Sequence, residues 1–421
     1  MGDLFSAPQD EGKNFANMIE QGYWGVHNFS STPPIIFLLY SLIFFCDYWP
    51  SFVANIWTLL ERIKMKRNLL ALAVGAAIAM PGVALADAAT IYGRMDLSLD
   101  RVNADNDTNL ANDSGSNWSV SSNASRFGVK GDADLGNGLK AIYKIEWQVD
   151  ADDGTNTLNA RNRYVGLSGG FGTVLLGMMD TPLKSAQGKV DQFNDWTGDI
   201  GNVLIGDYRA RNVISYASPK IADALTLTVA LPQIEQNEAA GCTTKYDGTT
   251  IDASDCEDGL FDVISASAVY SQKGFYAALA YDQAMPATSA NPLGATRFDT
   301  IRLVGSFTVG NAQLGAIYST SEENDDYISS AANEVEADGY LLSGAFTIGK
   351  TVLKAQYGST TYEMSGVKDV DVSLLSLGGD YMFTKQTKVY ANYNMWDLDN
   401  SNANTSDPSA DVLSLGMQHK F

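Results

Sequence analysis

The segment "IYGRMDLSLDR", residues 91–101, alternates between apolar and polar side chains. A period of two places successive side chains on opposite faces of a β-strand, so the segment predicts a strand with one apolar and one polar face. The last segment, "DVLSLGMQHKF" (residues 411–421), repeats the pattern. The apolar face needs a dry environment, and the polar face needs water.

The same pattern recurs throughout the chain after residue 90, where no helical periodicity is found. Segments of about ten residues end in turn residues, which is typical of a β-barrel. We count sixteen strands, which begin near residues 91, 125, 138, 161, 172, 209, 224, 261, 274, 297, 312, 337, 351, 371, 387 and 411. Short turns alternate with long acidic connections at 101–124, 150–160, 183–208, 237–260, 283–296, 322–337, 363–371 and 399–410.

An even number of strands with short turns at one end predicts an up-and-down antiparallel barrel. In lipid no backbone group can stay unpaired, so the sheet must close. Sixteen strands leave an aqueous lumen. A soluble β-sandwich would also alternate, but aromatic residues near strand ends favour a membrane barrel; these are Tyr92, Phe127, Tyr164, Phe171, Tyr216, Phe275, Tyr281, Tyr381, Phe383 and Phe421. The predicted fold is an all-β, 16-stranded antiparallel transmembrane β-barrel in an outer membrane.

The segment "MKRNLLALAVGAAIAMPGVALADA" (65–88) has the order of a secretory signal peptide. A basic start precedes a short apolar region, and Ala84-Leu85-Ala86 offers a cleavage site. An alternative is a buried Ala/Leu helix. We expect residues 65–86 to be a signal peptide, 87–421 the barrel domain, and 1–64 a non-native upstream extension from a start assigned too early. The apolar run 35–46 leaves a membrane anchor as the alternative for that extension.

The formal net charge of −21 excludes a basic nucleic-acid-binding surface. After the signal peptide only two cysteines remain, Cys242 and Cys256, in one polar loop. Because exported proteins meet oxidising conditions, we expect a disulfide between them. Two free surface thiols are the alternative.

Several segments together resemble the trimeric general-diffusion porins of Gram-negative outer membranes. They are "IYGRMDLSL", "SRFGVKGDADLGNGLKAIYKIEW", "RNRYVGLSGGFGTVLLG", "DTPLKSA" and the terminal "GMQHKF". The resemblance covers 89–421 and implies a homotrimer that allows passive diffusion of small hydrophilic solutes and ions. It also implies that Phe421 closes the barrel and that the loop after the fifth strand, 183–208, folds inward as a constriction.

The resemblance assigns acidic and basic residues to that constriction. Within the loop, Asp191, Asp195 and Asp199 are four residues apart and would share one face of a helical turn. They would face a basic wall formed by Arg94, Arg126, Arg161 and Arg209, with Arg163, Arg211 and Lys130 on the same faces. An arginine in a membrane strand must face water, because the lipid side costs about 2–4 kcal/mol. Salt bridges within the wall are the alternative. The apolar "VLIGDY" (203–208) would pack on the wall, which leaves the place of Asp207 open.

Other functions find less support. Residues 166–170 match G-x-S-x-G, but a strand follows, and the only histidine after the signal peptide is His419. We therefore expect no enzyme, no cofactor and no metal site, since Asp150 to Gly154 lacks the full calcium-loop spacing.

The alternatives left open are a substrate-selective channel of the same fold and a loop-mediated adhesion barrel. The expected partners are other copies of the chain, with 150–160 as a latch between them, lipopolysaccharide bridged by divalent ions, membrane lipid and small solutes. Ion preference stays open, because the acidic chain and the basic wall act in opposite directions.

Overall fold

The structure is a computed structural model that describes residues 89–105, 115–152, 158–233, 260–287, 292, 297–324, 334–364, 369–400 and 407–421. The first strands are β1 (Thr90–Asp105), β2 (Gly115–Ser122), β3 (Arg126–Gly136), β4 (Leu139–Val149), β5 (Leu158–Gly169), β6 (Gly172–Asp180), β7 (Arg209–Ala217) and β8 (Leu225–Pro232). The others are β9 (Ile264–Gln272), β10 (Phe275–Pro286), β11 (Arg297–Val309), β12 (Ala312–Glu323), β13 (Val335–Ile348), β14 (Thr351–Met364), β15 (Val370–Met382), β16 (Thr387–Asn400) and β17 (Ser409–Lys420).

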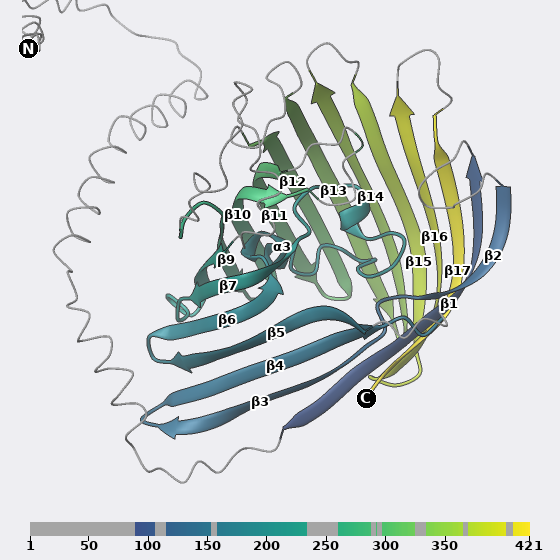
Figure 1. Cartoon of the computed structure of the whole chain (residues 1–421). Helices are drawn as coiled ribbons and strands as arrows, with labels where there is room; N and C mark the ends of the chain where they lie inside the picture. Colours follow the sequence, from purple (N-terminus) through teal and green to yellow (C-terminus); the bar gives the residue numbers. More distant parts are fainter. Residues whose placement is uncertain are drawn as a thin grey trace, which may run out of the picture. The chain divides into compact units, whose positions relative to one another are not determined.

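The strands form a closed antiparallel barrel (Figure 1). Pairing follows sequence order from β3 to β17, and β1 closes the ring by pairing with both β17 and β3. Because β2 and β3 share one position beside β1, the seventeen segments make sixteen barrel strands. This confirms the predicted fold class.

The second barrel strand differs from the prediction. We expected a long loop at 101–124, but β1 continues to Asp105 and β2 begins at Gly115. Residues 123–125 separate β2 from β3, and Ala124 has a φ of 48°. The polar extension is held by cross-strand pairs, such as the Arg101 guanidinium 5.5 Å from the Trp118 ring centroid. Pairing between two strands cannot be predicted from the alternation of side chains within a single segment.

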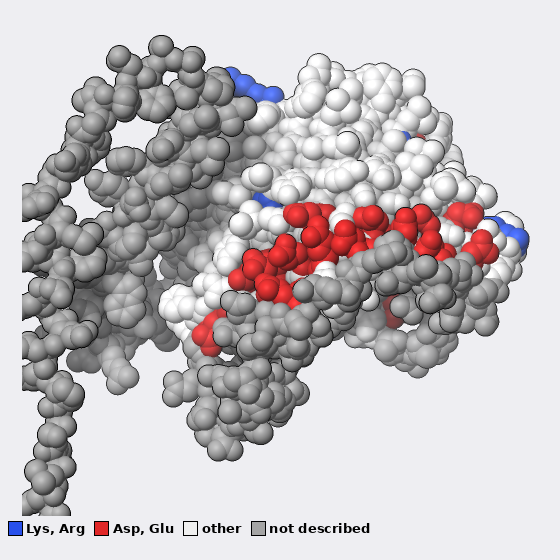
Figure 2. All heavy atoms as spheres, turned by 90° about the horizontal axis from the view of Figure 1, so that it is seen from above, with Lys and Arg blue, Asp and Glu red and all other residues white. Residues whose placement is uncertain are grey.

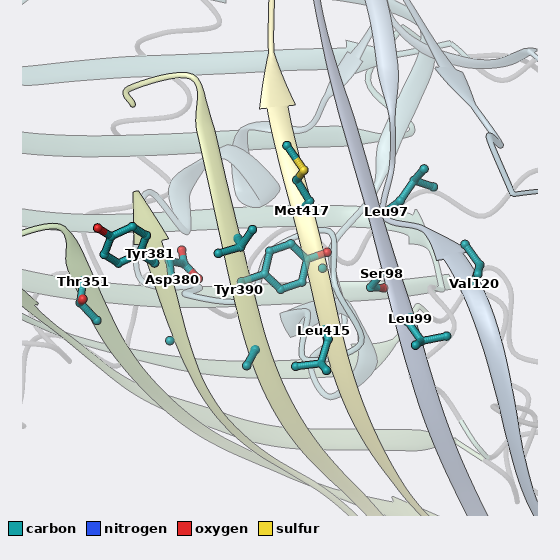
Figure 3. Close-up of a pocket in the computed structure, with 14 residues that line it drawn as sticks. Leu97, Ser98, Leu99, Val120, Thr351, Asp380, Tyr381, Tyr390, Leu415 and Met417 are labelled. Carbon is teal, nitrogen blue, oxygen red and sulfur yellow. The ribbon is translucent and has the colours of Figure 1, made fainter. Parts of the chain in front are cut away.

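The outer wall is apolar, as a lipid-facing surface requires. Figure 3 shows Leu97 and Leu99 of β1 with Leu415 and Met417 of β17 lining an outer groove of about 790 Å³. Leu99, Leu415 and Met417 are about half exposed. The alternation therefore separates a lipid-facing surface from a lumen, as predicted.

Two of the aromatic residues expected at the membrane interfaces instead face the lumen. The Tyr92 hydroxyl donates to Glu146 Oε2 over 2.8 Å. Tyr164 packs against the buried side chains of Met179 and Val213. Both residues lie on the lumen-facing side of their strands. A position near a strand end was therefore not enough to assign them to a membrane interface.

The C-terminus lies against the first strand. The Phe421 N–H donates to the Gly93 carbonyl over 3.1 Å, and the Gly93 N–H donates to the Phe421 carbonyl over 2.9 Å. The Phe421 ring covers Gly93 so closely that a β-carbon there would meet it. The last residue thus extends the pairing of β1 with β17.

Acidic side chains gather in a band on the face seen from above in Figure 2. At the long-loop ends of β11 to β14, four carboxylates lie directly opposite one another across neighbouring strands: Asp299, Glu322, Glu336 and Glu363. Like charges in such pairs are unfavourable, so the row does not stabilise the sheet by itself.

The predicted upstream extension at 1–64, the predicted signal peptide at 65–86, and both Cys242 and Cys256 lie outside the described residues. Within the described part of the chain, the longest runs of helix are too short and too polar to traverse a bilayer.

Candidate functional site

The segment between β6 and β7, residues 181–208, carries the short helix α3 (Pro182–Ala186) and the 3-10 turn η1 (Ile200–Asn202). Thr181 caps α3, because its hydroxyl accepts from the Lys184 N–H over 3.1 Å, and Pro182 occupies the first helical position. We call this segment the constriction loop, since its side chains contact the inner barrel wall.

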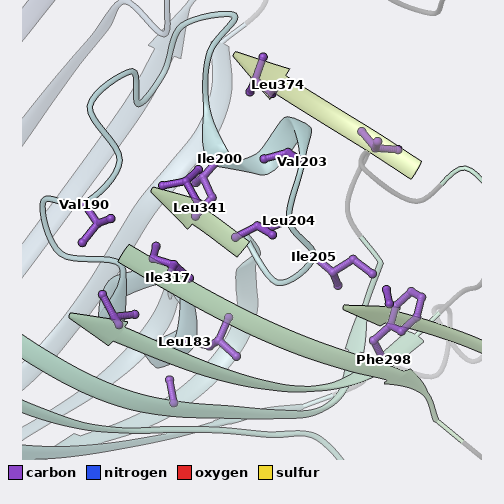
Figure 4. Packing of buried hydrophobic residues seen from close by; sticks show 14 of the residues in the cluster. Leu183, Val190, Ile200, Val203, Leu204, Ile205, Phe298, Ile317, Leu341 and Leu374 are labelled. Atoms are coloured by element: carbon purple, nitrogen blue, oxygen red, sulfur yellow. The ribbon is translucent and has the colours of Figure 1, made fainter. Parts of the chain in front are cut away.

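Apolar side chains hold the loop on the wall formed by β10 to β15 (Figure 4). From the loop, the completely or almost completely buried ones in this cluster are Leu183, Ala186, Val190, Ile200, Val203, Leu204 and Ile205. Burying one such aliphatic side chain stabilises by about 1.5–3 kcal/mol. This exceeds what an exposed ion pair contributes, about 0–1 kcal/mol. The apolar run at 203–205 packs on the wall, as the sequence predicted.

Glycines in the wall provide the space for these loop side chains. At four positions a β-carbon would come within 3 Å of a loop side-chain atom: Gly315 faces Val190, Gly339 faces Leu204, Gly358 faces Val203, and Gly378 faces Phe193. The four glycines lie on β12, β13, β14 and β15. They let the loop approach the wall more closely than any other residue would allow.

A buried charge fixes the end of the loop. Arg302 of β11 is fully buried, and its Nη2 donates to the Ile205 carbonyl. Its Nη1 lies 4.0 Å from Asp207 Oδ1, and Lys184 Nζ lies 3.0 Å from Asp207 Oδ2. Asp207 thus balances two cations where the loop rejoins the wall.

Asp195 meets three of the predicted wall arginines directly. Its Oδ2 lies 2.9 Å from Arg94 Nη2 and 3.1 Å from Arg126 Nη2, and its Oδ1 lies 3.8 Å from Arg161 Nη2. Burial opposes ionisation of Asp195, but the three guanidinium charges lower its pKa below the usual range. The loop therefore reaches the opposite wall by direct ion pairs, where we had expected a gap of water.

Asp191 and Asp199 line the cavities together with wall arginines, but their carboxylates bond to loop N–H groups and do not share one helical face, which corrects the prediction. No helical turn spans the three acids, so their spacing of four does not give a common face. Asp191 accepts from the N–H groups of Phe193 (2.9 Å) and Ile200 (3.2 Å). Asp199 accepts from those of Asp195 (2.6 Å) and Gly201 (2.8 Å).

Both carboxyl groups therefore serve loop N–H groups that no secondary structure satisfies. Burial, with the nearby charge of Asp207 adding to it, raises the pKa of Asp191 to about 6. Burial and the charges of Asp191 and Asp207 raise the pKa of Asp199 well above its usual value.

Arg209 lines the upper cavity together with Asp195 but pairs with other residues, and Lys130 packs on an aromatic ring. The Arg209 Nε lies 2.9 Å from Asp180 Oδ1 and donates to Asn162 Oδ1 over 2.8 Å, so this arginine makes the salt bridge within the wall that we had kept as an alternative. Lys130 shares the face of Arg126 and lies over the Tyr92 ring, 5.1 Å from its centroid.

Arg163 does not join the basic wall, so its assignment was wrong. The pairing of β4 with β5 shifts register between Ile145 and Trp147, which reverses the alternation after Arg161. The Arg163 guanidinium lies 5.2 Å from the Trp147 ring centroid on the outer face. Arg211 lines a separate small cavity with Pro232 and other residues. Residues two apart along a strand no longer share a face when a β-bulge lies between them.

Two cavities meet at the constriction loop. The upper cavity, about 510 Å³, lies toward the long loops, since it includes the last residue of β6 and the first of β7. The lower cavity, about 410 Å³, lies toward the short turns, where β14 begins and β17 ends. Both are lined by Gln187, Gly188 and Asn194, so these residues mark the passage beside the Asp195 ion pairs.

The charges of the two cavities differ. The upper cavity is lined by five basic and five acidic residues. The lower cavity is lined by five basic residues, Arg94, Lys189, Lys354, Lys388 and Lys420, and only two acidic ones, Asp191 and Asp380. The lumen around the loop is therefore more basic than the chain as a whole.

Sequence reasoning missed Lys354 and Lys388. Their Nζ atoms lie 3.0 and 2.8 Å from Asp380 carboxylate oxygens, on the inner face of β14, β15 and β16. The alternation of polar and apolar side chains within their strands could have assigned both lysines to the lumen. The resemblance drew attention only to basic residues of the first six predicted strands.

Comparison with known proteins agrees with this architecture. Residues 71–402 match the sequence profile described as Gram-negative porin. Outer membrane porin protein 32 of Delftia acidovorans is 28% identical over 373 residues, which cover 85% of this chain and 93% of that protein. A major outer membrane protein P.IB of Neisseria gonorrhoeae is 33% identical over 166 residues, 38% of this chain and 46% of that protein.

Solved structures show the same fold. An anion-selective porin from Comamonas acidovorans superimposes with a TM-score of 0.59 at 22% identity, over 79% of this chain and 99% of that one. The trimer form of OmpT from Vibrio cholerae gives 0.57 at 18% identity, over 80% and 100%. The closed barrel, the inward loop and the matched profile lead to one conclusion: the chain belongs to the Gram-negative porin family, whose members form channels in the outer membrane.

Proposed function

We propose that this porin passes small hydrophilic solutes by passive diffusion and favours anions at its constriction. The observation that carries the proposal is the lower cavity, where five basic residues outnumber two acidic ones. Protonation of Asp191, whose pKa is about 6, would remove one of these two negative charges only at pH values below about 6. Charges between low-dielectric walls act strongly on an ion that passes within a few ångströms.

The net charge of −21 does not oppose this proposal at physiological salt. Exposed carboxylates such as Glu336 and Glu363 sit at the long-loop ends of the strands. At physiological salt the Debye length is about 8 Å, so charges at the rim are screened from the constriction. The anion selectivity of the Comamonas acidovorans porin is consistent with the same preference here.

Liposome swelling tests the proposal with solutes of matched size and different charge. We expect anionic solutes to enter faster than cationic ones, and a Lys354→Gln/Lys388→Gln double variant to reduce the difference. Lys220→Gln, in the turn between β7 and β8, is the control and should behave as the wild type. Equal entry of both solutes into wild-type liposomes would contradict the proposed preference.

We also infer that the chain assembles as a homotrimer and contacts lipopolysaccharide. Related porins of the same fold support self-association, one of them solved as a trimer. The row of paired carboxylates at the ends of β11 to β14 supports bridging by divalent ions to lipid phosphates. Removal of divalent ions by a chelator should then lower the melting temperature of the assembly in lipopolysaccharide.

A substrate-selective channel finds no comparable support. Such a channel would use a track of aromatic side chains along the lumen, and of the two candidates in the loop only Trp196 lines a cavity. Phe193 is fully buried, and Trp196 is only 8% exposed. They belong to the attachment of the loop.

A further inference from the structure

The tip of the constriction loop is attached to the wall through Trp196. Its indole N–H donates to Asp96 Oδ2 over 3.3 Å, and its ring centroid lies 4.5 Å from that of Tyr390. Asp96 is fully buried and also accepts from the Tyr390 hydroxyl (2.7 Å) and from Gln418 Nε2 (2.6 Å). A buried carboxylate with three donors is well satisfied, so Trp196 meets a preformed acceptor.

Two lysines complete this attachment. Lys354 Nζ lies 4.0 Å and Lys388 Nζ 4.2 Å from the Trp196 ring centroid. An ammonium group over an indole face gains about 0.5–2 kcal/mol. The ring thereby holds both cations beside Asp380, at the edge of the lower cavity. A residue that only filled space would need neither the N–H bond nor the two cations.

We propose that Trp196 is the positioning residue that places Asp195 against the arginines and so sets the ion selectivity of the channel. Asp195 directly precedes Trp196 and has a φ of 68°, in the left-handed region that is unfavourable for a non-glycine residue. Backbone hydrogen bonds tie Trp196 to both sides of the loop, from its N–H to the Phe193 carbonyl (3.0 Å) and from the Asp199 N–H to its own carbonyl (2.9 Å). Holding the indole against Asp96 of β1 therefore places the Asp195 carboxylate beside Arg94 of the same strand.

The inference rests on the proposed function, because it assumes that charge at this point decides selectivity. A double-mutant cycle tests it by zero-current potentials in planar bilayers under a KCl gradient. In the wild type, Asp195→Asn should shift the potential toward anion selectivity. In the Trp196→Ala background the same Asp195→Asn substitution should lose this effect, because Asp195 no longer lies on the arginines.

An Asp195→Asn shift of full wild-type size in the Trp196→Ala background would overturn the inference. Trp196→Phe, which removes the N–H bond to Asp96 and keeps an aromatic ring, should weaken the shift in the same way and serves if Trp196→Ala does not fold. Trp118→Ala is the matched control, because Trp118 is 59% exposed on β2, and it should leave the shift intact. The cycle compares shifts of the zero-current potential between variants and does not depend on the selectivity of the wild type. A cation-selective wild type would therefore contradict the proposed function, and the cycle would still test the coupling between Trp196 and Asp195.

Discussion

At the scale of single residues, charge type was predictable and side-chain direction was not. Asp195 and Asp191 lie in the same acidic stretch of the loop, yet only Asp195 reaches the arginines. Asp191 bonds to backbone N–H groups because the loop has an irregular path, and no sequence pattern describes that path. Arg163 was misplaced for a similar reason, since the β-bulge beside it is a feature of pairing between strands.

The raised pKa of Asp191 predicts a pH-dependent selectivity. Burial raises this pKa to about 6, so lowering the pH through 6 neutralises one of the two acidic residues of the lower cavity. We expect the ratio of anion to cation permeability to rise between about pH 7 and pH 5. The zero-current potential across this range measures the effect.

The Asp191→Asn variant is the comparison for this experiment. It should show the low-pH selectivity of the wild type at every pH, and an unchanged pH response in this variant would assign the titration to another group. Linkage gives the corresponding sign for stability. Because the folded pKa exceeds the unfolded value of about 3.9, the contribution of Asp191 is greatest below pH 4 and is lost as the pH rises through 6.

At the scale of elements, strands were predictable because alternation is a local property. The starts of β4, β6 and β12 lie within a residue of their predicted positions. The packing of the constriction loop on the barrel wall was only partly predictable. The apolar run at 203–205 indicated wall packing, but the matching of Val190 with Gly315 and of Leu204 with Gly339 joins segments far apart in sequence.

That matching predicts the effect of filling one wall position. Gly339→Val would place a side chain against Thr360 of the wall and Leu204 of the loop, because a β-carbon there would meet both side chains. Overpacking of this kind costs about 1–3 kcal/mol and should push the loop into the lumen. We expect a lower single-channel conductance with a barrel that still migrates as folded on unheated gels.

Gly305→Val is the control for this prediction, because nothing lies within 4 Å of a β-carbon at Gly305. Its conductance should equal that of the wild type. If Gly339→Val also keeps wild-type conductance, the loop does not press on the wall at this point.

At the scale of the whole molecule, closure of the barrel followed from the strand count and from the demand that every backbone group in lipid be paired. Assembly depends on surfaces between copies, which the alternation of one chain does not describe. The predicted latch at 150–160 lies partly outside the described residues. Within them, Asp152 Oδ2 accepts from the Ser122 N–H of the same chain over 3.0 Å.

Deletion of residues 152–156 tests the predicted latch. We expect a lower melting temperature of the trimer and a nearly unchanged single-channel conductance, because Asp152 contacts Ser122 and the deletion removes no residue of the constriction loop. Trimer melting on unheated gels and bilayer recording are the two measurements. Native trimer stability in the deletion variant would show that the latch lies elsewhere.

The central claim is that the constriction loop and the basic wall, and not the acidic exterior, set the ion preference. The most direct measurement is the zero-current potential of the wild-type channel in a KCl gradient at moderate salt and again near 1 M salt. We predict a potential with the sign set by chloride that declines as the Debye length falls to about 3 Å at 1 M. A potential with the sign set by potassium would contradict the account.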